Sequence, residues 1–277
     1  MGIIGRKQEI DALKTALQAG RSILLEGPVG VGKTALACHV ASSLDRTYIR
    51  IDGDSRYTEQ KLVGTWDLTQ TMAQGMNQES FRPGPLSQAM QEGSILLINE
   101  LNRMPELVQN ILLPALDEGL IYVPQLGTLK AKKGFAVIAT QNPRDFVGTG
   151  HLSEALNDRL EWMSISYPSF EEELAIVQDH VPDSKNIAAQ TELAIELIRL
   201  TRSHPKLKRG ASVRAALSLV ELLSATQDHS EAKFWELAKM ALATRVEFLP
   251  GVVTQGNLSK QLDLLLLELK DQLKKKS

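Results

Sequence analysis

Short apolar runs alternate with helical patterns through about the first 165 residues of the chain. Between the runs, apolar residues recur at helical spacing, as they do at Ile10, Leu13 and Leu17. Strands that alternate with helices form a parallel sheet with helices on both faces, so a three-layered α/β fold is expected. The predicted strands are 22–26, 47–51, 95–98, 135–140 and 162–165.

The pattern changes after Tyr167-Pro168-Ser169, where the strand signals stop and helical periodicity continues to the end of the chain. We therefore place a domain boundary near Pro168, with an α/β domain over residues 1–168 and an all-helical domain over residues 169–277. The helices expected in the second domain are roughly 170–180, 190–203, 212–225, 231–247 and 257–275.

Three segments of the first domain depart from simple alternation. Residues 64–84 are rich in Gln, Met, Gly and Thr, which predicts a long and irregular connection. Residues 120–123 and 127–130 predict a hairpin, and Ser153 to Leu160 a helix. Pro105 opens an amphipathic helix whose expected inner face comprises Leu107, Ile111, Leu112, Ala115 and Leu116.

Between the first predicted strand and the next helix lies the motif G-x-x-x-x-G-K-T, a phosphate-binding P-loop. Its glycines let successive backbone N–H groups point at phosphate oxygens, and the helix N-terminus adds a positive dipole end. Lys33 would reach the β- and γ-phosphates, and the Thr34 hydroxyl would bind Mg²⁺. ATP and Mg²⁺ are therefore the expected cofactors. The expected nucleotide-binding residues here are Gly27, Pro28, Val29, Gly30, Val31, Gly32, Lys33, Thr34 and Ala35.

The charge of the chain is nearly balanced, with a formal net charge of −2. No global positive field would draw the protein to nucleic acid or to anionic lipid, so neither partner is expected. The single cysteine, Cys38, excludes an intramolecular disulfide framework and favours a reducing compartment. No signal-peptide pattern and no run approaching the ~20 apolar residues of a membrane span is found, so a cytoplasmic location is expected.

A P-loop, an apolar strand ending in an acidic residue, a strand ending in Asn and a helical tail follow one another in an order that resembles the AAA+ ATPases. The resemblance is closest to the MoxR branch and covers about residues 2 to 225. The motifs that carry it are E-L-N-R at 100–103, A-T-Q-N-P at 139–143, G-T-G-H-L-S-E-A-L-N-D-R-L at 148–160 and G-A-S-V-R at 210–214. It implies an AAA+ nucleotide-binding domain followed by a helical lid.

Two catalytic roles implied by the resemblance also follow from chemistry. Glu100, at the carboxyl end of a buried strand, can orient and deprotonate the water that attacks the γ-phosphate. Asn142, at the sensor-1 position, can hold that water or a γ-phosphate oxygen. The alternatives are a solvated glutamate at a strand end and an ordinary turn-forming Asn before Pro143.

Other roles rest on the resemblance. Arg159 is similar to the arginine finger that a neighbouring subunit inserts, and Arg214 to the sensor-2 arginine of the lid. Ile3 and Ile4 would pack on the adenine. The alternatives are a helix-capping or structural arginine in the first two cases and ordinary core packing in the third.

The resemblance further implies a ring of identical subunits, expected to be hexameric, that remodels or activates a protein client. In this branch the client often carries a von Willebrand factor A domain. Two inserts mark the branch, here around 64–80 and 120–130. Their apolar side chains could contact a client or pack on their own domain.

The chain departs from the family pattern at Asn99, where AAA+ proteins normally carry an Asp that binds Mg²⁺ through a water. An amide can still accept a hydrogen bond, but it lacks the negative charge of a carboxylate. Asn99 and Thr34 are therefore the expected metal-site residues, and a rival function follows. The protein could be an ATP-gated scaffold in which hydrolysis is weak or vestigial.

Changing Asn99 to Asp is expected to lower the Mg²⁺ concentration that ATP hydrolysis needs and to raise its rate where chemistry limits turnover. The reason is that a full negative charge attracts a nearby divalent cation more strongly than an amide does. A Mg²⁺ titration of the ATPase rate for both proteins measures the effect. Superimposable curves would show that the missing carboxylate is compensated elsewhere.

Overall fold

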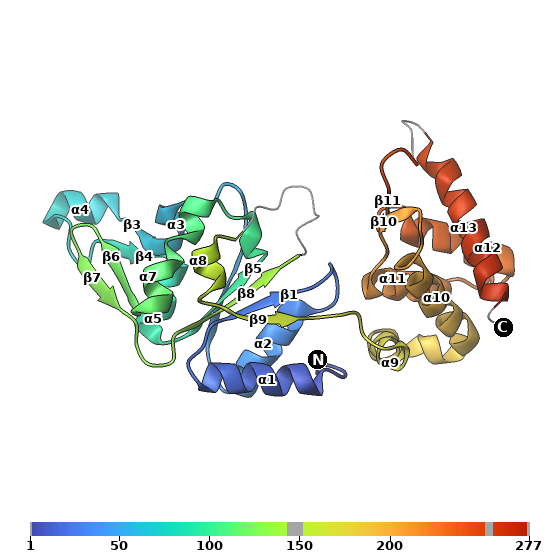
Figure 1. Ribbon diagram of the computed structural model, residues 1–277, viewed down its shortest axis with the longest axis horizontal. Coiled ribbons are helices and arrows are strands. Elements are labelled where there is room, and N and C mark those ends of the chain that lie inside the picture. The colour runs from blue at the N-terminus through green and yellow to red at the C-terminus, as the bar shows by residue number, and fades with distance from the viewer. Residues whose placement is uncertain (1, 143–151, 253–256, 276–277) are drawn as a thin grey trace. The chain divides into compact units, whose positions relative to one another are not determined.

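A parallel five-stranded sheet forms the centre of the first part of the chain (Figure 1). The strand order β2-β5-β8-β1-β9 places β5 and β8 in the interior, where nearly every one of their residues is buried. This order confirms the predicted three-layered α/β fold, and each predicted strand lies within one residue of an observed one. The bounds are β1 Ile23–Glu26, β2 Tyr48–Asp52, β5 Ile95–Asn99, β8 Ala136–Gln141 and β9 Glu161–Ser164.

The computed structural model describes residues 2–142, 152–252 and 257–275. The chain divides into two compact units, the first comprising Met1–Pro28 and Gly32–Ser166 and the second Val29–Val31 and Tyr167–Ser277. Each unit has its own hydrophobic core.

Helices cover both faces of the sheet. In Figure 1 the blue helices α1 and α2 lie on one side of the sheet and the green helices α5, α7 and α8 on the other. Helix α1 buries Leu13 and Leu17, as its spacing predicts, and α5 buries Leu86 and Met90. The bounds are α1 Lys7–Gln18, α2 Lys33–Ser43, α5 Pro85–Glu92, α7 Leu112–Asp117 and α8 Glu154–Asn157.

The prediction of an irregular connection over 64–84 is wrong. After helix α3 (Glu59–Val63), strands β3 (Gly64–Trp66) and β4 (Phe81–Pro83) pair antiparallel and flank helix α4 (Leu68–Gln74). Trp66 and Phe81 meet edge to face at 5.3 Å between ring centroids, which anchors the pair to the domain. Hydrophobic periodicity does not reveal this organisation in a segment rich in methionine and glutamine. A helical pattern requires a polar outer face, and the outer face of α4 is apolar.

The helix expected from Pro105 onward is broken into two short helices, α6 (Glu106–Gln109) and α7. Pro114 has no N–H for the Asn110 carbonyl, and Leu113 N donates to that carbonyl instead, in a tighter turn. Leu107 is 83% exposed, so its assignment to the inner face is wrong. The predicted hairpin is confirmed as β6 (Leu120–Val123) and β7 (Gly127–Lys130), whereas only 154–157 of the expected 153–160 helix form α8.

The second unit is mainly helical, and Ser169 and Glu172 begin its first helix with a capping box. It is not all-helical, because β10 (Leu207–Arg209) pairs antiparallel with β11 (Glu247–Phe248) and ends the expected 231–247 helix early. A 3₁₀ segment, Pro182–Ile187, precedes the second helix. The α-helices are α9 Phe170–His180, α10 Ala188–Thr201, α11 Val213–Ala225, α12 Glu231–Leu242 and α13 Leu258–Lys274.

Substituting Gly53 by Ala is expected to destabilise the first unit by about 1–3 kcal/mol, because the added Cβ would overlap the Glu100 carbonyl oxygen. Urea unfolding followed by circular dichroism measures the change. Gly2→Ala is the control, since no heavy atom lies within 4 Å of a Cβ at Gly2. Equal midpoints for the two variants would contradict the close approach of the ends of β2 and β5.

Candidate functional site

The P-loop connects the carboxyl end of β1 to the first turn of α2. Gly30 and Gly32 adopt φ angles of 79° and 92°, which residues with a side chain rarely accept. Gly32 is also the N-cap of α2 and has no side chain to cap it, and the N–H groups at such a helix start are those that bind anions in P-loops. The backbone geometry therefore suits phosphate, as the motif predicts.

The Lys33 side chain is only 7% exposed and turns back along the loop. Its ammonium donates to the carbonyl oxygens of Gly27 and Pro28, at 2.7 and 2.9 Å, and to Asn142 Oδ1 at 3.1 Å. A buried ammonium needs such acceptors because desolvation of an unpaired charge is costly. Lys33 is thus held beside the loop, and its charge can be offered to a phosphate.

Asn142 connects Lys33 with Glu100. While its Oδ1 accepts from Lys33, its Nδ2 donates to Glu100 Oε1 at 3.1 Å. The other carboxylate oxygen of Glu100 accepts from Arg103 Nη1 at 2.7 Å. Glu100 itself has a φ of 55°, a left-handed conformation uncommon outside glycine. The P-loop lysine, the sensor position and the predicted base therefore form one hydrogen-bonded chain.

Asn99 forms a second cluster with hydroxyl groups. Its Oδ1 accepts from Thr34 Oγ1 at 2.7 Å and from Thr140 Oγ1 at 2.9 Å. Thr140 Oγ1 in turn accepts from the backbone N–H of Glu100 at 3.0 Å. The two residues predicted for the metal site, Thr34 and Asn99, are therefore in direct contact.

The amide nitrogen of Asn99 donates to Asp52 Oδ1 at 2.8 Å. Partial burial works to raise the pKa of Asp52, but hydrogen bonds from Asn99 and Arg50 outweigh it and hold the pKa below its ordinary value. The Thr34 hydroxyl therefore lies beside the Asn99 amide oxygen, and the Asp52 carboxylate lies on the other side of that amide. Oxygen ligands are what Mg²⁺ prefers, so the site fits a magnesium-bound phosphate.

For the remaining predicted site residues the structure shows local contacts and exposure. Arg159 Nη1 donates to Ala155 O, and its Nε lies 2.6 Å from Asp117 Oδ1. Ile3 and Ile4 are half-buried ahead of α1. Arg214 is exposed in the first turn of α11, in the second unit. Residues 143–151, with Pro143 and the G-T-G-H part of the family motif, lie outside the described residues.

Comparison with known proteins identifies the family. The family described as "AAA domain (dynein-related subfamily)" matches residues 22–160. Gas vesicle ATPase GvpN of Haloferax mediterranei is 30% identical over 83% of this chain and 70% of its own. The chain belongs to the AAA+ ATPases of the MoxR type. Members of this family are ATPases, and AAA+ ATPases generally form oligomeric rings.

Other AAA+ relatives extend the match. YeaC of Bacillus subtilis is 29% identical over 80% of this chain and 74% of its own. A solved structure from Cytophaga hutchinsonii, described as an ATPase, has a TM-score of 0.53 and 23% identity over 96% of this chain and 90% of its own. At that identity the structure supports the fold alone, a P-loop sheet with a helical region.

Sequence reasoning missed three residues of this AAA+ site: Asp52, Thr140 and Arg103. Thr140 stands inside the quoted A-T-Q-N-P motif, and Arg103 inside E-L-N-R. Asp52 had a weaker signal, as a carboxylate directly after the predicted strand 47–51, whose neighbours in the sheet were not predicted. Only the pairing of β2 with β5 shows that it lies beside Asn99.

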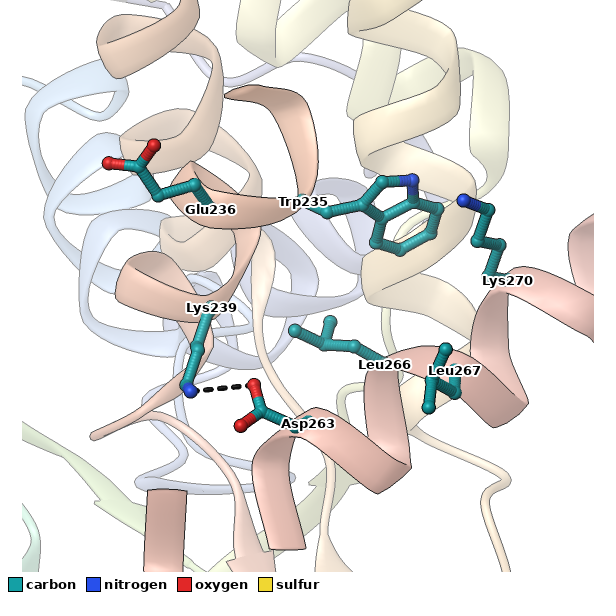
Figure 2. A pocket seen from close by; sticks show the side chains of 7 residues that line it. All are labelled: Trp235, Glu236, Lys239, Asp263, Leu266, Leu267 and Lys270. Atoms are coloured by element: carbon teal, nitrogen blue, oxygen red, sulfur yellow. Dashed lines mark ion pairs between the residues drawn. The ribbon is translucent and has the colours of Figure 1, made fainter. Parts of the chain in front are cut away.

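A cavity of about 370 Å³ lies between α12 and α13 (Figure 2). Lys239 pairs there with Asp263 at 2.6 Å, and Lys270 lies over the Trp235 ring at 5.5 Å and pairs with Glu231. These cations already have partners in the same unit, and the cavity has no phosphate-binding loop. It is lined by Trp235, Glu236, Lys239, Asp263, Leu266, Leu267 and Lys270.

Among residues 2–142, 152–252 and 257–275, no three His, Cys, Asp or Glu side chains come together in a way that could hold a metal ion. Within the same ranges, none of the helices combines the length and apolarity needed to cross a membrane.

Replacing Lys33 by Ala is expected to weaken ATP binding by at least about tenfold and to leave the unfolding midpoint within a few degrees, because the ammonium faces the loop and not the apolar core. Titration of a fluorescent ATP analogue measures the affinity. Lys7→Ala, in the exposed first turn of α1, is the control. Equal affinity for Lys33→Ala and wild type would overturn the site.

Proposed function

We propose that this chain binds ATP with Mg²⁺ at the P-loop and hydrolyses it in a ring of identical subunits, using the energy to remodel or activate a client protein. The observation that carries the proposal is the hydrogen-bonded chain from Lys33 through Asn142 to Glu100. It links a phosphate-binding cation to a carboxylate that can act as a base.

The proposed reaction is attack of a water on the γ-phosphate. Glu100 takes a proton from the water while the oxygen of the water bonds to the γ-phosphorus. The bond between that phosphorus and the β–γ bridging oxygen breaks, which leaves ADP and phosphate. Lys33 and the N–H groups of the loop stabilise the charge on the phosphate oxygens. Bound Mg²⁺, held beside Thr34 and Asn99, would neutralise further phosphate charge.

Asn142 is the positioning group in this scheme. Because its two polar atoms contact Lys33 and Glu100, it orients the base relative to the phosphate-binding cation. Arg103 forms an ion pair with the other oxygen of Glu100, which directs Oε1 toward Asn142.

Assembly would complete the site. We propose that Arg159 acts on the nucleotide of a neighbouring subunit and that Asp117 holds its guanidinium until then. Arg214 would act as the lid arginine, and Ile3 and Ile4 would contact the adenine. A hexamer is the proposed ring size, by family resemblance.

Exposed apolar side chains support a protein client. Leu68 and Met72 on α4 project outward, and Tyr122 does so on the hairpin. Both segments are the inserts of the MoxR branch, and large apolar residues at exposed positions are typical of interaction surfaces. A von Willebrand factor A domain is the proposed client class. The balanced charge argues against a motor that acts on nucleic acid. The single cysteine favours a cytoplasmic location.

A second candidate is an ATP-gated scaffold with weak or vestigial hydrolysis. Asn99 favours it, because an amide stands where a carboxylate would help to hold Mg²⁺, and it already accepts the Thr34 hydroxyl. Mg²⁺-dependent turnover by the assembled protein separates the two. ATP-dependent assembly without turnover would establish the scaffold.

Arg159→Ala and Glu100→Gln are each expected to bind ATP nearly normally and to hydrolyse it at least ~10²-fold more slowly. If Arg159 acts across a subunit boundary, a mixture of the two variants should recover part of the wild-type rate. Some interfaces in mixed rings then pair an intact arginine with an intact base. The steady-state ATPase rate of the mixture, against each variant alone, is the measurement.

Arg21→Ala is the matched control, since Arg21 is an exposed arginine in an ion pair with Glu161 at 2.8 Å. It should retain the wild-type rate. No recovery on mixing, together with a rate strictly linear in protein concentration where sizing detects dissociation, would contradict the role across subunits.

A further inference from the structure

The orientation of the Asn99 amide is set from two sides. Its oxygen accepts from the hydroxyls of Thr34 and Thr140, and its nitrogen donates to Asp52. Rotating the amide by half a turn would place its oxygen against the Asp52 carboxylate, which offers no proton. Asp52 therefore decides which atom of Asn99 faces the P-loop threonine.

The backbone places Asp52 at this position firmly. Asp52 and Asn99 are register partners at the ends of the parallel strands β2 and β5. The next residue, Gly53, donates its N–H to Asn99 O at 2.7 Å and packs so closely on Glu100 that only glycine is accommodated. The end of β2 is thus clamped to the strand that carries the predicted metal and base residues.

Asp52 also keeps its charge available. Its side chain is 62% exposed, and its one ion-pair partner among the described residues is Arg50, at 3.1 Å. Arg50 is itself about half exposed, so water screens that pair strongly. A carboxylate therefore stands one strand away from the position where the family normally has one.

We propose that Asp52 supplies the negative charge that Asn99 lacks, so that Asp52 and Asn99 together replace the family's metal-binding aspartate toward the Mg²⁺ of bound nucleotide. The inference rests on the proposed function, in that it requires ATP to bind at the P-loop. Mg²⁺ gives up its waters reluctantly, so a carboxylate can act on it through a water without direct contact. Asp52 is here a positioning residue.

The test is the coupling between Mg²⁺ and nucleotide binding, with no need for turnover. A fluorescent ATP analogue is titrated onto the full chain over a series of free Mg²⁺ concentrations, and the Mg²⁺ concentration at half-maximal effect is recorded. Asp52→Asn should raise that concentration about tenfold, as loss of one charge near a divalent cation in a partly exposed site implies. Affinity without Mg²⁺ should change little.

Asp54→Asn is the matched control. Asp54 lies two residues further on, carries the same charge and is paired with Arg56 at 3.0 Å. It should leave the Mg²⁺ dependence within about twofold of wild type, because the hydrogen bonds of Asp54 are with Arg56, whereas those of Asp52 include Asn99. Equal shifts for Asp52→Asn and Asp54→Asn would overturn the inference.

Two further variants extend the same titration. One is Asn99→Asp, and the other is the double variant that carries both Asp52→Asn and Asn99→Asp. The double variant exchanges amide and carboxylate, which preserves the hydrogen bond between the side chains at positions 52 and 99. The double variant should reach half-maximal nucleotide binding at about the same Mg²⁺ concentration as wild type. The single variant Asn99→Asp should need less Mg²⁺, because it has carboxylates at both positions 52 and 99. Identical half-maximal Mg²⁺ concentrations for Asn99→Asp and for the double variant would show that Asp52 contributes nothing.

The two proposals fail in different ways. If the analogue does not bind to wild type with or without Mg²⁺, the proposed nucleotide site itself is wrong. If it binds and Mg²⁺ strengthens binding equally in wild type and Asp52→Asn, only the role of Asp52 is wrong.

Discussion

The Asn99 side chain joins three elements of the first unit, and the arrangement of the site depends on those hydrogen bonds. It accepts from Thr34 on α2 and Thr140 on β8, and it donates to Asp52 on β2. These contacts are possible because parallel strands end at the same edge of a sheet. Strand β5, which lies between β2 and β8, therefore brings the P-loop helix and these two neighbouring strands to one amide group.

A second constraint is the buried ammonium of Lys33. Desolvation of this charge is offset by carbonyl oxygens of the loop and by Asn142. Because Asn142 also contacts Glu100, the cation and the proposed base are coupled through one side chain. A phosphate that attracts Lys33 would change the surroundings of Glu100 as well, which gives a physical route from binding to catalysis.

Family membership and site chemistry support different parts of the functional picture. The comparisons establish an AAA+ ATPase of the MoxR type, and the site explains how such a chain could bind and cleave a triphosphate. A contact with the proposed client would depend on exposed apolar side chains, which this chain carries on α4 and on the hairpin. Asn99 stands where the family pattern has Asp, and its amide nitrogen donates to the Asp52 carboxylate.

The sequence by itself determined the strands, most of the helices and the P-loop, because these depend on local periodicity and on a motif whose residues are contiguous. It did not determine the inserted strands β3 and β4, whose apolar residues are split between a packed face and an exposed one. Pro114 broke a helix that its apolar spacing favoured. The tertiary structure alone decided that Asp52 meets Asn99 and that Arg159 meets Asp117, since both pairs are distant in sequence and meet only through strand order and helix packing.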